Sequence, residues 1–484
     1  MAVTIYPTGT TIYDPTQCWN GYTVFQPIMN DPTSPGATLI DMNGNAVHQW
    51  KGLDGFPNKV LPGGFIMGNT GVRNPKYGFQ DMTDLVQVDW EGNIVWGFHG
   101  YELVEDPGQE KTWMARQHHD YQRQGNPVGY YVPGADPLVN RGHTLLLTHK
   151  NLQNPKISDK LLLDDTIIEV TWDGQIVWEW QCSDHFDELG FDDVAKKTLA
   201  QNPAMKDTGG GMGDWMHINS MSTLGPNRWF DAGDKRFHPD NIIWDSRQSN
   251  ILAITDKKTG KIVWRVGPDY TASEALQKLG QIIGQHHAHM IPRGLPGEGN
   301  ILVYDNGGWA GYGAPNPGAM TGMNNALRDY SRVLEFDPVT LEIVWQYTPK
   351  EAGFVVPLNA SLFYSGFISS AQRLPNGNTL ITEGAGGRIF EVTPKHEIVW
   401  EYVSPYKGGQ RNMNIVYRAY RLPYDWIPQL PKPEERALPK LDIRRFRVPG
   451  SPRRKAVKAV KVKSGQTIYE GQFCVMPTTD TQKG

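Results

Sequence analysis

The chain has 484 residues and a formal net charge of −4 at pH 7, so its overall charge gives no signal for nucleic-acid binding. Its length exceeds that of one ordinary core and favours several domains or a repeat architecture. No apolar run approaches the roughly 18 residues of a membrane span, and three scattered cysteines argue against a disulfide framework or a cysteine zinc site.

The N-terminal residues MAVTIYPTGTTIYDPTQ lack the basic start and the apolar segment of a secretory signal. As written, the sequence predicts a cytoplasmic protein; if a leader was removed, the prediction changes to a periplasmic or secreted one. We expect residues 1–36 to form an N-terminal segment that precedes the main fold.

One pattern then recurs six times along the chain: an apolar strand, a turn, and a second strand that contains a tryptophan. Several turns carry N-G, D-G or T-G, and the strands alternate with period two, so each copy predicts a β-hairpin. The copies cover residues 38–50, 85–98, 167–180, 251–266, 332–347 and 388–402. Their tryptophans are Trp50, Trp96, Trp178, Trp264, Trp345 and Trp400.

A further strand pair follows each hairpin, most clearly at 289–307 and 371–384. Four strands in each of six copies predict an all-β fold, a six-bladed β-propeller over residues 37–425. Long insertions between strands occur at 99–140, 181–214, 268–285, 307–330 and 348–365. We expect them to lie over one end of the ring and to build a binding site there.

The inner strands carry an unusual number of histidines. The inner-strand segments can be aligned on the Leu-Pro or Ile-Pro pair that follows them. One column of this alignment then contains His119, His217, His287, Ser370 and Arg418. A second column, two residues later on the same face, contains Tyr121, Asn219, His289, Gln372 and Tyr420. The first blade offers Pro57 and Lys59 at these positions. Because equivalent strands of a propeller surround one axis, we expect His119, His217, His287 and His289 to meet at one mouth of the channel.

Several segments resemble bacterial arylsulfate sulfotransferases over about residues 8–425. They are TGTTIYDPTQCWNGYTVFQP (8–27), ATLIDMNGNAVHQWK (37–51), DWMHINSM (214–221), NILVYDNGG (300–308), YSRVLEF (330–336) and LPNGNTLITEG (374–384). The resemblance implies a six-bladed propeller that moves a sulfuryl group between phenols through a sulfurylated histidine, with no cofactor.

Carried over by motif, the resemblance implies that His217 and His287 are acid–base or donor groups and that Arg332 holds sulfate oxygens. We predict His119 as a further catalytic residue, and we predict substrate contacts from Asn219, Asn306, Gln372, Arg418 and Tyr420. The stretch SGFISSAQRL has no histidine where the family's nucleophile is expected. His119 or His289 is then the candidate nucleophile, acting on a small aromatic substrate.

Three other functions compete with this interpretation. His119, His217, His287 and His289 would together suit a Zn, Cu or Fe ion in a lyase, hydrolase or oxidoreductase, with His118, Asp120 or Tyr121 as further ligands. His149 aligns with Asp305 and would also reach the channel. The tryptophan hairpins also resemble those of quinoprotein dehydrogenases. A non-catalytic interaction propeller is the remaining alternative, and the polar column argues against it.

The C-terminal extension, residues 426–484, differs from the rest in being strongly basic between Pro431 and Ser464. We expect it to pack on its own body or on a neighbouring subunit of a homo-oligomer. Neither a nucleic acid nor a membrane is the expected partner.

Overall fold

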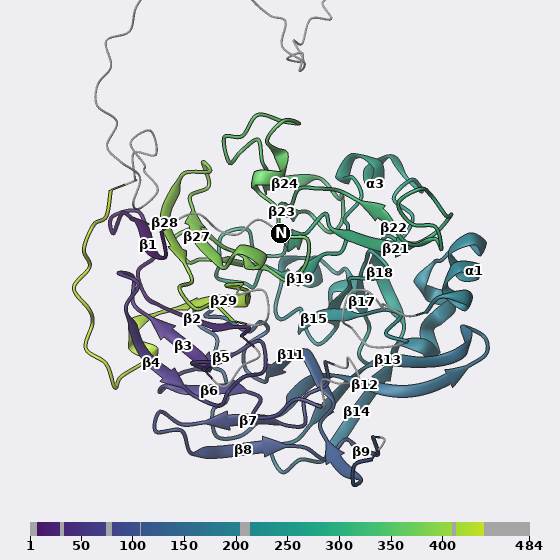
Figure 1. The fold of residues 1–484 in the computed structure, drawn as a ribbon, viewed down its shortest axis with the longest axis horizontal. Coiled ribbons are helices and arrows are strands. Elements are labelled where there is room, and N and C mark those ends of the chain that lie inside the picture. Colours follow the sequence, from purple (N-terminus) through teal and green to yellow (C-terminus); the bar gives the residue numbers. More distant parts are fainter. Residues whose placement is uncertain are drawn as a thin grey trace, which may run out of the picture. The chain divides into compact units, whose positions relative to one another are not determined.

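The computed structural model describes residues 7–29, 33–73, 80–106, 108–203, 213–408 and 413–439. They belong to the first of two compact units, residues 1–440; the second, 441–484, lies outside the described part of the chain. Six antiparallel sheets of the first unit form a ring around a central axis (Figure 1). The fold is therefore a mainly β six-bladed propeller, as the repeats predict.

The blades are numbered I to VI in chain order, and the strands of each are given from the axis outward. Blade I contains β5 (Lys59–Leu61), β6 (Phe65–Gly68), β7 (Leu85–Val88) and β8 (Ile94–Phe98). Blade II contains β11 (Gln117–Arg123), β12 (Thr144–Asn154), β13 (Ser158–Val170) and β14 (Ile176–Gln181). Blade III contains β15 (Ile218–Thr223), β16 (Ile242–Ser246), β17 (Ile251–Thr255) and β18 (Ile262–Val266).

Blade IV contains β19 (His286–Met290), β20 (Ile301–Asp305), β23 (Arg332–Phe336) and β24 (Ile343–Tyr347). Blade V contains β25 (Ser370–Arg373), β26 (Thr379–Glu383), β27 (Arg388–Val392) and β28 (Ile398–Val403), and β1 (Gly9–Tyr13) is its fifth strand. Blade VI contains β29 (Val416–Leu422), β2 (Tyr22–Pro27), β3 (Ala37–Ile40) and β4 (Ala46–Trp50).

Blade VI closes the ring with strands from both ends of the described chain. Its inner strand β29 pairs with β2, with Tyr420 opposite Val24, and β1 extends blade V by pairing with β28. The ring therefore includes residues 9–13 and 22–27, and it does not begin at residue 37 as the sequence analysis expected. The partner of β1, and the partner of β2 on the side of the axis, lie nearly 400 positions away, and β2 also pairs with β3.

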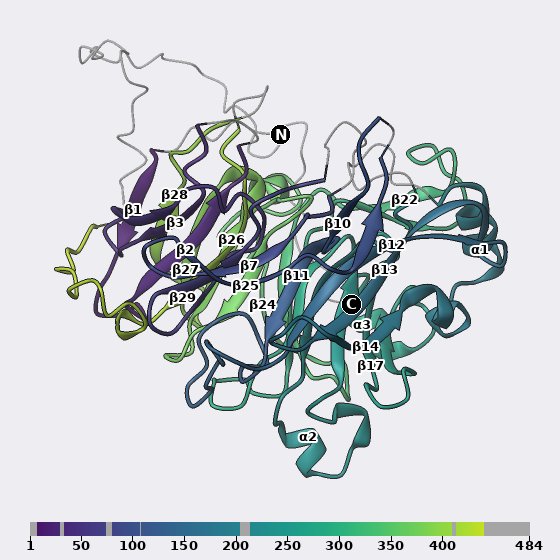
Figure 2. The ribbon, with the colours of Figure 1, turned by 90° about the horizontal axis from the view of Figure 1, so that it is seen from below.

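The insertions between strands carry short elements. They are the hairpins β9 (Glu102–Val104)/β10 (Thr112–Met114) and β21 (Trp309–Tyr312)/β22 (Met323–Leu327), the helices α1 (Asp193–Gln201), α2 (Arg228–Asp231) and α3 (Glu274–Leu279), and 3₁₀ turns η2 (Cys182–Leu189), η3 (Lys235–Phe237), η4 (Ala360–Leu362), η5 (Gly384–Gly386) and η6 (Tyr424–Trp426). Figure 2 shows α2, which follows the end of β15, on the opposite face from β10 and β22. No helix of the described residues is long and apolar enough to cross a membrane.

The repeated tryptophans join each blade to the next around the whole ring. Each indole N–H donates to a backbone carbonyl in the outer hairpin turn of the following blade, which satisfies a polar group at a largely apolar interface. The bonds run from Trp50 to Asp89, Trp96 to Trp172, Trp178 to Lys257, Trp264 to Pro338, Trp345 to Pro394 and Trp400 to Met42. In blade VI, His48 takes the strand position that tryptophan has elsewhere and stacks on Trp90.

The described part of the C-terminal extension packs on the chain's own blades. Leu438 forms a β-bridge with Tyr13, the amide of Asn43 donates to the carbonyl of Glu434, and the Tyr22 hydroxyl donates to the carbonyl of Pro431. Residues 440–484, which include most of the basic stretch, lie outside the described residues. Packing on a neighbouring subunit stays a prediction.

Candidate active centre

Three histidines share an unusual backbone conformation at the inner strands of blades II, III and IV. His119, His217 and His287 have φ angles of 53°, 52° and 58°, a left-handed region that costs a non-glycine residue energy. In each blade the inner strand carries a register shift close to the histidine. The shared conformation supports grouping these three positions, and such strain is typical of functional sites.

The strand register agrees with the sequence alignment in only some of the blades. In each blade the paired residues run inward from the tryptophan of the outer strand, or from His48 in blade VI, to one position on the inner strand. The residues at one level of the inner strands are Lys59, Gln122, Ser222, His289, Gln372 and Tyr420. Tyr121 and Asn219, which the alignment placed in this column, are displaced by one and three positions. The inner strands β11, β15 and β19 all carry bulges, which add residues to one strand only, so equal spacing in the sequence does not give equal level in the sheet.

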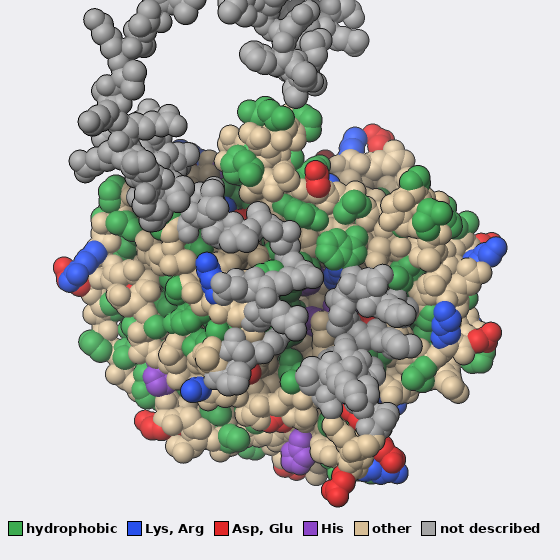
Figure 3. Space-filling model, in the orientation of Figure 1, with side chains coloured by type: hydrophobic (Ala, Val, Ile, Leu, Met, Phe, Trp, Pro, Cys, Tyr) green, Lys and Arg blue, Asp and Glu red, His purple; other side chains and the backbone are tan. Residues whose placement is uncertain are grey.

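The four predicted histidines come together as two pairs. The rings of His119 and His217 have centroids 4.6 Å apart, and those of His287 and His289 are 4.5 Å apart. All four are at least 95% buried. Histidine surface is visible near the middle of the ring face in Figure 3.

His217 is held by a carboxylate three residues earlier in the sequence. Its Nδ1 lies 2.6 Å from Oδ2 of Asp214, so the carboxylate orients the ring and favours the tautomer with the proton on Nδ1. Nε2 is then the lone-pair nitrogen. Arg247 follows β16, and its backbone N–H donates to the carbonyl of His217 at 3.1 Å. Burial first, and the positive charge of Arg247 second, hold the pKa of His217 well below its usual value.

The second pair is more fully committed to protein partners. His289 Nδ1 lies 2.9 Å from the carbonyl oxygen of His287, and its Nε2 lies 2.8 Å from the hydroxyl of Tyr130. Both ring nitrogens of His289 are thus occupied, which leaves no free lone pair for a metal while these contacts persist. The Nδ1 of His287 is buried without a partner among the described residues.

Beside this pair, Asp120 holds two cations. Its carboxylate oxygens lie 2.5 Å from Lys59 Nζ and 3.0 Å from Arg418 Nη1. Arg418 also donates to the hydroxyl of Tyr420 at 3.0 Å. Lys59 of blade I and Arg418 of blade VI therefore meet at one buried carboxylate of blade II, and Tyr420 of blade VI holds Arg418.

Four further predicted residues are engaged by their own surroundings. Arg332 lies 2.8 Å from Asp305 through Nε and donates to the carbonyls of Leu279 and Gln281. The Asn306 amide donates to the carbonyls of Ser365 and Ile368. The Asn219 amide donates to the carbonyl of Gln285, and Gln372 donates to the carbonyl of Arg421.

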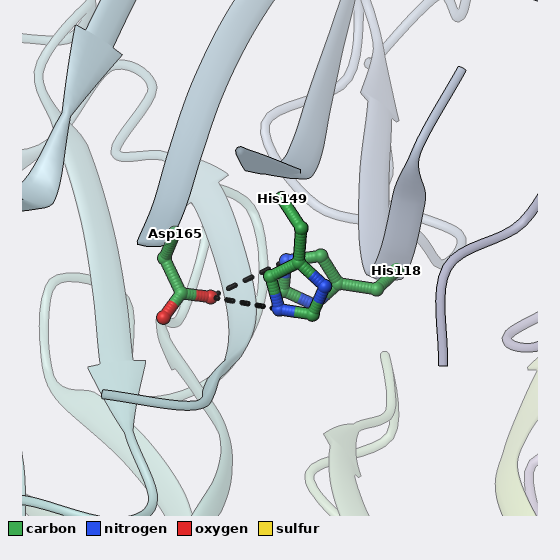
Figure 4. Close-up of side chains that lie close together, drawn as sticks. All are labelled: His118, His149 and Asp165. Atoms are coloured by element: carbon green, nitrogen blue, oxygen red, sulfur yellow. Dashed lines mark ion pairs between the residues drawn. The ribbon is translucent and has the colours of Figure 1, made fainter. Parts of the chain in front are cut away.

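A second polar cluster, behind His119 and His217, contains residues that sequence reasoning largely missed. His118 and His149 stack with ring centroids 3.5 Å apart, and the Nε2 of each faces Oδ1 of Asp165, at 3.3 and 3.8 Å (Figure 4). Oδ1 of Asp214 lies 3.9 Å from the same Nε2 of His149. All four side chains have no exposed surface.

Outer carboxylate and guanidinium groups orient this cluster. His149 Nδ1 lies 2.6 Å from Oδ1 of Asp81, while Arg116 and Arg73 contact Oδ2 of Asp81 at 2.8 and 3.1 Å. Burial opposes the charge of Asp81, but Arg116 and His149 hold the pKa of its carboxyl below the usual range. Burial lowers the pKa of His118 to about 4.

The two clusters meet at adjacent residues. His118 Nδ1 lies 2.9 Å from His119 Nδ1, and Asp214 faces His217 through one oxygen and His149 through the other. A cavity of about 660 Å³ elsewhere in the molecule borders Tyr13 and Tyr347 on the outer strands of blades IV and V. The imidazole centre is thus separate from that cavity.

The fold and this centre define a class: a six-bladed propeller with a buried imidazole–carboxylate site on its axis. The model of the arylsulfotransferase (ASST) family matches residues 137–413, more than half of the chain. The protein belongs to the arylsulfotransferase family.

Comparison with solved structures gives only remote similarity. A protein of unknown function from Bacteroides caccae is 10% identical with a TM-score of 0.43, over 83% of this chain and 99% of that one. Virginiamycin B lyase from Staphylococcus aureus is 12% identical with a TM-score of 0.34, over 84% and 88%. No curated protein matches the chain.

Proposed function

We propose that this member of the family is a transferase that moves a sulfuryl group between aromatic hydroxyl groups, with His217 as the nucleophile. The observation that carries the proposal is the pair formed by Asp214 and His217, in which Nδ1 and Oδ2 are 2.6 Å apart. A carboxylate that fixes the tautomer of an imidazole is the arrangement that nucleophilic and general-base histidines need. His217 also belongs to the D-W-x-H-x-N-S stretch that carries the family resemblance.

The chemistry requires a proton carrier and a cation as well as a nucleophile. The Nε2 lone pair of His217 would form an N–S bond while the aryl O–S bond breaks. His119, whose ring lies 4.6 Å from that of His217, would donate a hydrogen bond to the departing phenolate oxygen. Burial holds the pKa of His119 well below its usual value, so the neutral ring would then accept the proton of the acceptor phenol as the phenol oxygen takes the sulfuryl group from Nε2, and would release that proton to the departing phenolate or to water.

Arg247 is the cation that we assign to the sulfuryl oxygens. Transfer spreads negative charge over the equatorial oxygens of the group, and a guanidinium is suited to bind such oxygens in a fork. Arg247 is 97% buried, and its charge already acts on both His217 and His286. Arg332, for which the resemblance implied this role, is bound to Asp305 and to backbone carbonyls.

The test uses 4-nitrophenyl sulfate as donor and phenol as acceptor. We expect His217→Asn to abolish nitrophenolate release and Asp214→Asn to lower kcat on the order of 10³-fold, since the amide no longer fixes the tautomer. His99→Ala, an exposed histidine beyond β8, is the matched control and should retain full activity.

A donor-only incubation separates a covalent role of His217 from a supporting one. The intact protein should gain the mass of one sulfuryl group, carried by the peptide that contains His217, and His119→Ala should gain it more slowly. Normal turnover by a folded His217→Asn protein, or a sulfuryl group on another residue, would refute the assignment.

A further inference from the structure

Behind the proposed nucleophile, three side chains from blade II bring ligand atoms close together, and their two imidazoles are stacked. His118 lies on β11, His149 on β12 and Asp165 on β13, and one ligand atom of each lies within 4.8 Å of the others. We infer that His118, His149 and Asp165 bind a divalent transition-metal ion such as Zn²⁺, with Asp214 next to it. This site contains none of the four histidines that the sequence predicted as the main ligands, although His118 was predicted as a further ligand there.

The distances fit a metal better than they fit direct contacts. Ligand atoms bound tetrahedrally at 2.0–2.2 Å lie about 3.3–3.6 Å from one another. The Nε2 atoms of His118 and His149 lie 3.3 and 3.8 Å from Oδ1 of Asp165, and His149 Nε2 lies 3.9 Å from Oδ1 of Asp214. These separations are long for a strong N–H···O⁻ hydrogen bond but close to those of ligands around an ion.

Three of these four atoms lack partners, and so does the second oxygen of Asp165. Nε2 of His118, Nε2 of His149, Oδ2 of Asp165 and Oδ1 of Asp214 are buried with no hydrogen bond among the described residues. An unsatisfied buried polar atom costs about 1–3 kcal/mol, and four of them in one place need an explanation. One bound cation would satisfy them together.

The charges around these atoms also call for a cation. The described ion pairs of Asp165 involve only the two imidazoles, so no arginine or lysine balances it, and Asp214 lies close by. The charge of Arg247 acts on Asp214 but is not among the described interactions of Asp165, and a buried carboxylate without compensation is unfavourable. A divalent ion would neutralise both.

The surrounding residues match the outer shell of a metal site. Metal-binding histidines usually give their other ring nitrogen to a carboxylate, which fixes the ring and its tautomer. His149 does so with Asp81 at 2.6 Å, and Arg116 holds Asp81 in turn. Nε2 of His149 is therefore presented as a lone pair. Oδ1 of Asp165 is fixed by the backbone N–H of Ile218 at 3.2 Å.

The experiment uses the full chain without substrate and Co²⁺ alone as the probe. After removal of metal with a chelator, one Co²⁺ per chain should bind and give a visible ligand-field band, and Zn²⁺ should displace it. We expect His149→Ala and Asp165→Asn to weaken binding more than 100-fold. Asp81→Asn, which removes only the outer carboxylate, should weaken it 10- to 100-fold.

His143→Ala is the matched control. His143 precedes β12 and pairs with Glu169 on β13 at 2.8 Å, so the two also form a histidine–carboxylate pair, but a half-buried one that solvent reaches. It should bind Co²⁺ as the unchanged chain does. A Co²⁺ titration of the unchanged chain that shows no ligand-field band would overturn the proposal. A band that is unaltered in folded His149→Ala and Asp165→Asn proteins would also overturn it. If these two variants do not fold, an unaltered band in Asp81→Asn overturns it instead. Because the readout is metal binding, it is independent of sulfuryl transfer.

Discussion

Asp245 shows how burial sets the properties of a single side chain. Its Oδ2 accepts hydrogen bonds from the Ser220 hydroxyl at 2.9 Å and from the backbone N–H of Ala288 at 2.8 Å. Burial nonetheless raises the pKa of Asp245 to about 7, and the hydrogen bonds and the charge of Arg418 reverse this only in part. Below about pH 7 the neutral carboxyl is therefore the form that predominates in the folded state.

This preference predicts a pH-dependent effect of Asp245→Asn. The folded pKa lies above the unfolded value, so the folded state binds the proton more tightly, and the aspartate lowers stability as the pH rises from about 4 to about 7. At about 1.4 kcal/mol per pKa unit, the effect is a few kcal/mol. Urea unfolding at pH 5 and pH 8 should show Asp245→Asn becoming more stable relative to the unchanged chain.

Asp240→Asn provides the control, because the Asp240 side chain is 76% exposed. It should follow the unchanged chain at both pH values. If the stability difference between Asp245→Asn and the unchanged chain is the same at pH 5 and pH 8, burial of the charged form is not the controlling factor.

Part of the candidate site could be predicted from single residues and part could not. His217 and His287 were found because they recur before similar strands. The sequence predicts His118 only as a further metal ligand and His149 only as a residue that reaches the channel, and it does not predict Asp165. Adjacent residues of a regular strand face opposite sides. The left-handed conformation of His119 breaks that rule and brings His118 Nδ1 and His119 Nδ1 to 2.9 Å.

At the scale of elements, the indole bonds between blades predict a graded loss of stability. Trp264 is 7% exposed and its N–H lies 2.7 Å from the carbonyl of Pro338. The corresponding distance from Trp345 to Pro394 is 3.2 Å, at a more exposed site. Replacement by phenylalanine removes the donor and some packing area.

We expect Trp264→Phe to lower the free energy of unfolding by about 1–2 kcal/mol and Trp345→Phe by less, because a hydrogen bond contributes about 1 kcal/mol net and an exposed carbonyl can bond to water instead. Chemical denaturation of both variants measures the difference. Equal losses would mean that the indole N–H does not distinguish the two interfaces.

The outer hairpins were predictable because each contains its own turn and its own tryptophan within about 15 residues. The strands β1 and β2 were not, because β1 pairs with β28 and β2 pairs with β29 at the other end of the sequence, and the hairpin repeat does not extend to the pairing of β2 with β3. A local pattern reports on a strand only when turn and partner are near in the chain. The register of the inner strands was hidden for a related reason, since bulges leave no consistent sequence signature.

For the whole molecule, the seam between blades V and VI contains a buried ion pair. Arg421 on β29 lies 3.2 Å from Glu391 on β27 and also donates to the Thr23 hydroxyl on β2 and to the carbonyl of Trp19. Neither charged side chain has exposed surface. One guanidinium thus connects the two ends of the chain to blade V.

We expect Arg421→Met to lower the free energy of unfolding by about 3–5 kcal/mol, because it leaves the Glu391 carboxylate buried without its cation. Adding Glu391→Gln should restore part of the loss, since the amide oxygen still accepts from Asn378 and from the backbone of Trp19. A double-mutant cycle by denaturation gives the coupling. If the double variant is as unstable as the sum of the two singles, the pair does not act as a unit.

The composition of blade VI has a consequence for biosynthesis. Roughly 390 residues separate the end of β2 from the start of β29, and at about 5–20 residues per second their translation takes about 20–80 s. During that time β2 has an open edge toward the axis. Nascent chains would therefore expose an unpaired strand edge until β29 emerges from the ribosome. A chaperone that binds this edge during that interval would prevent it from pairing with another chain.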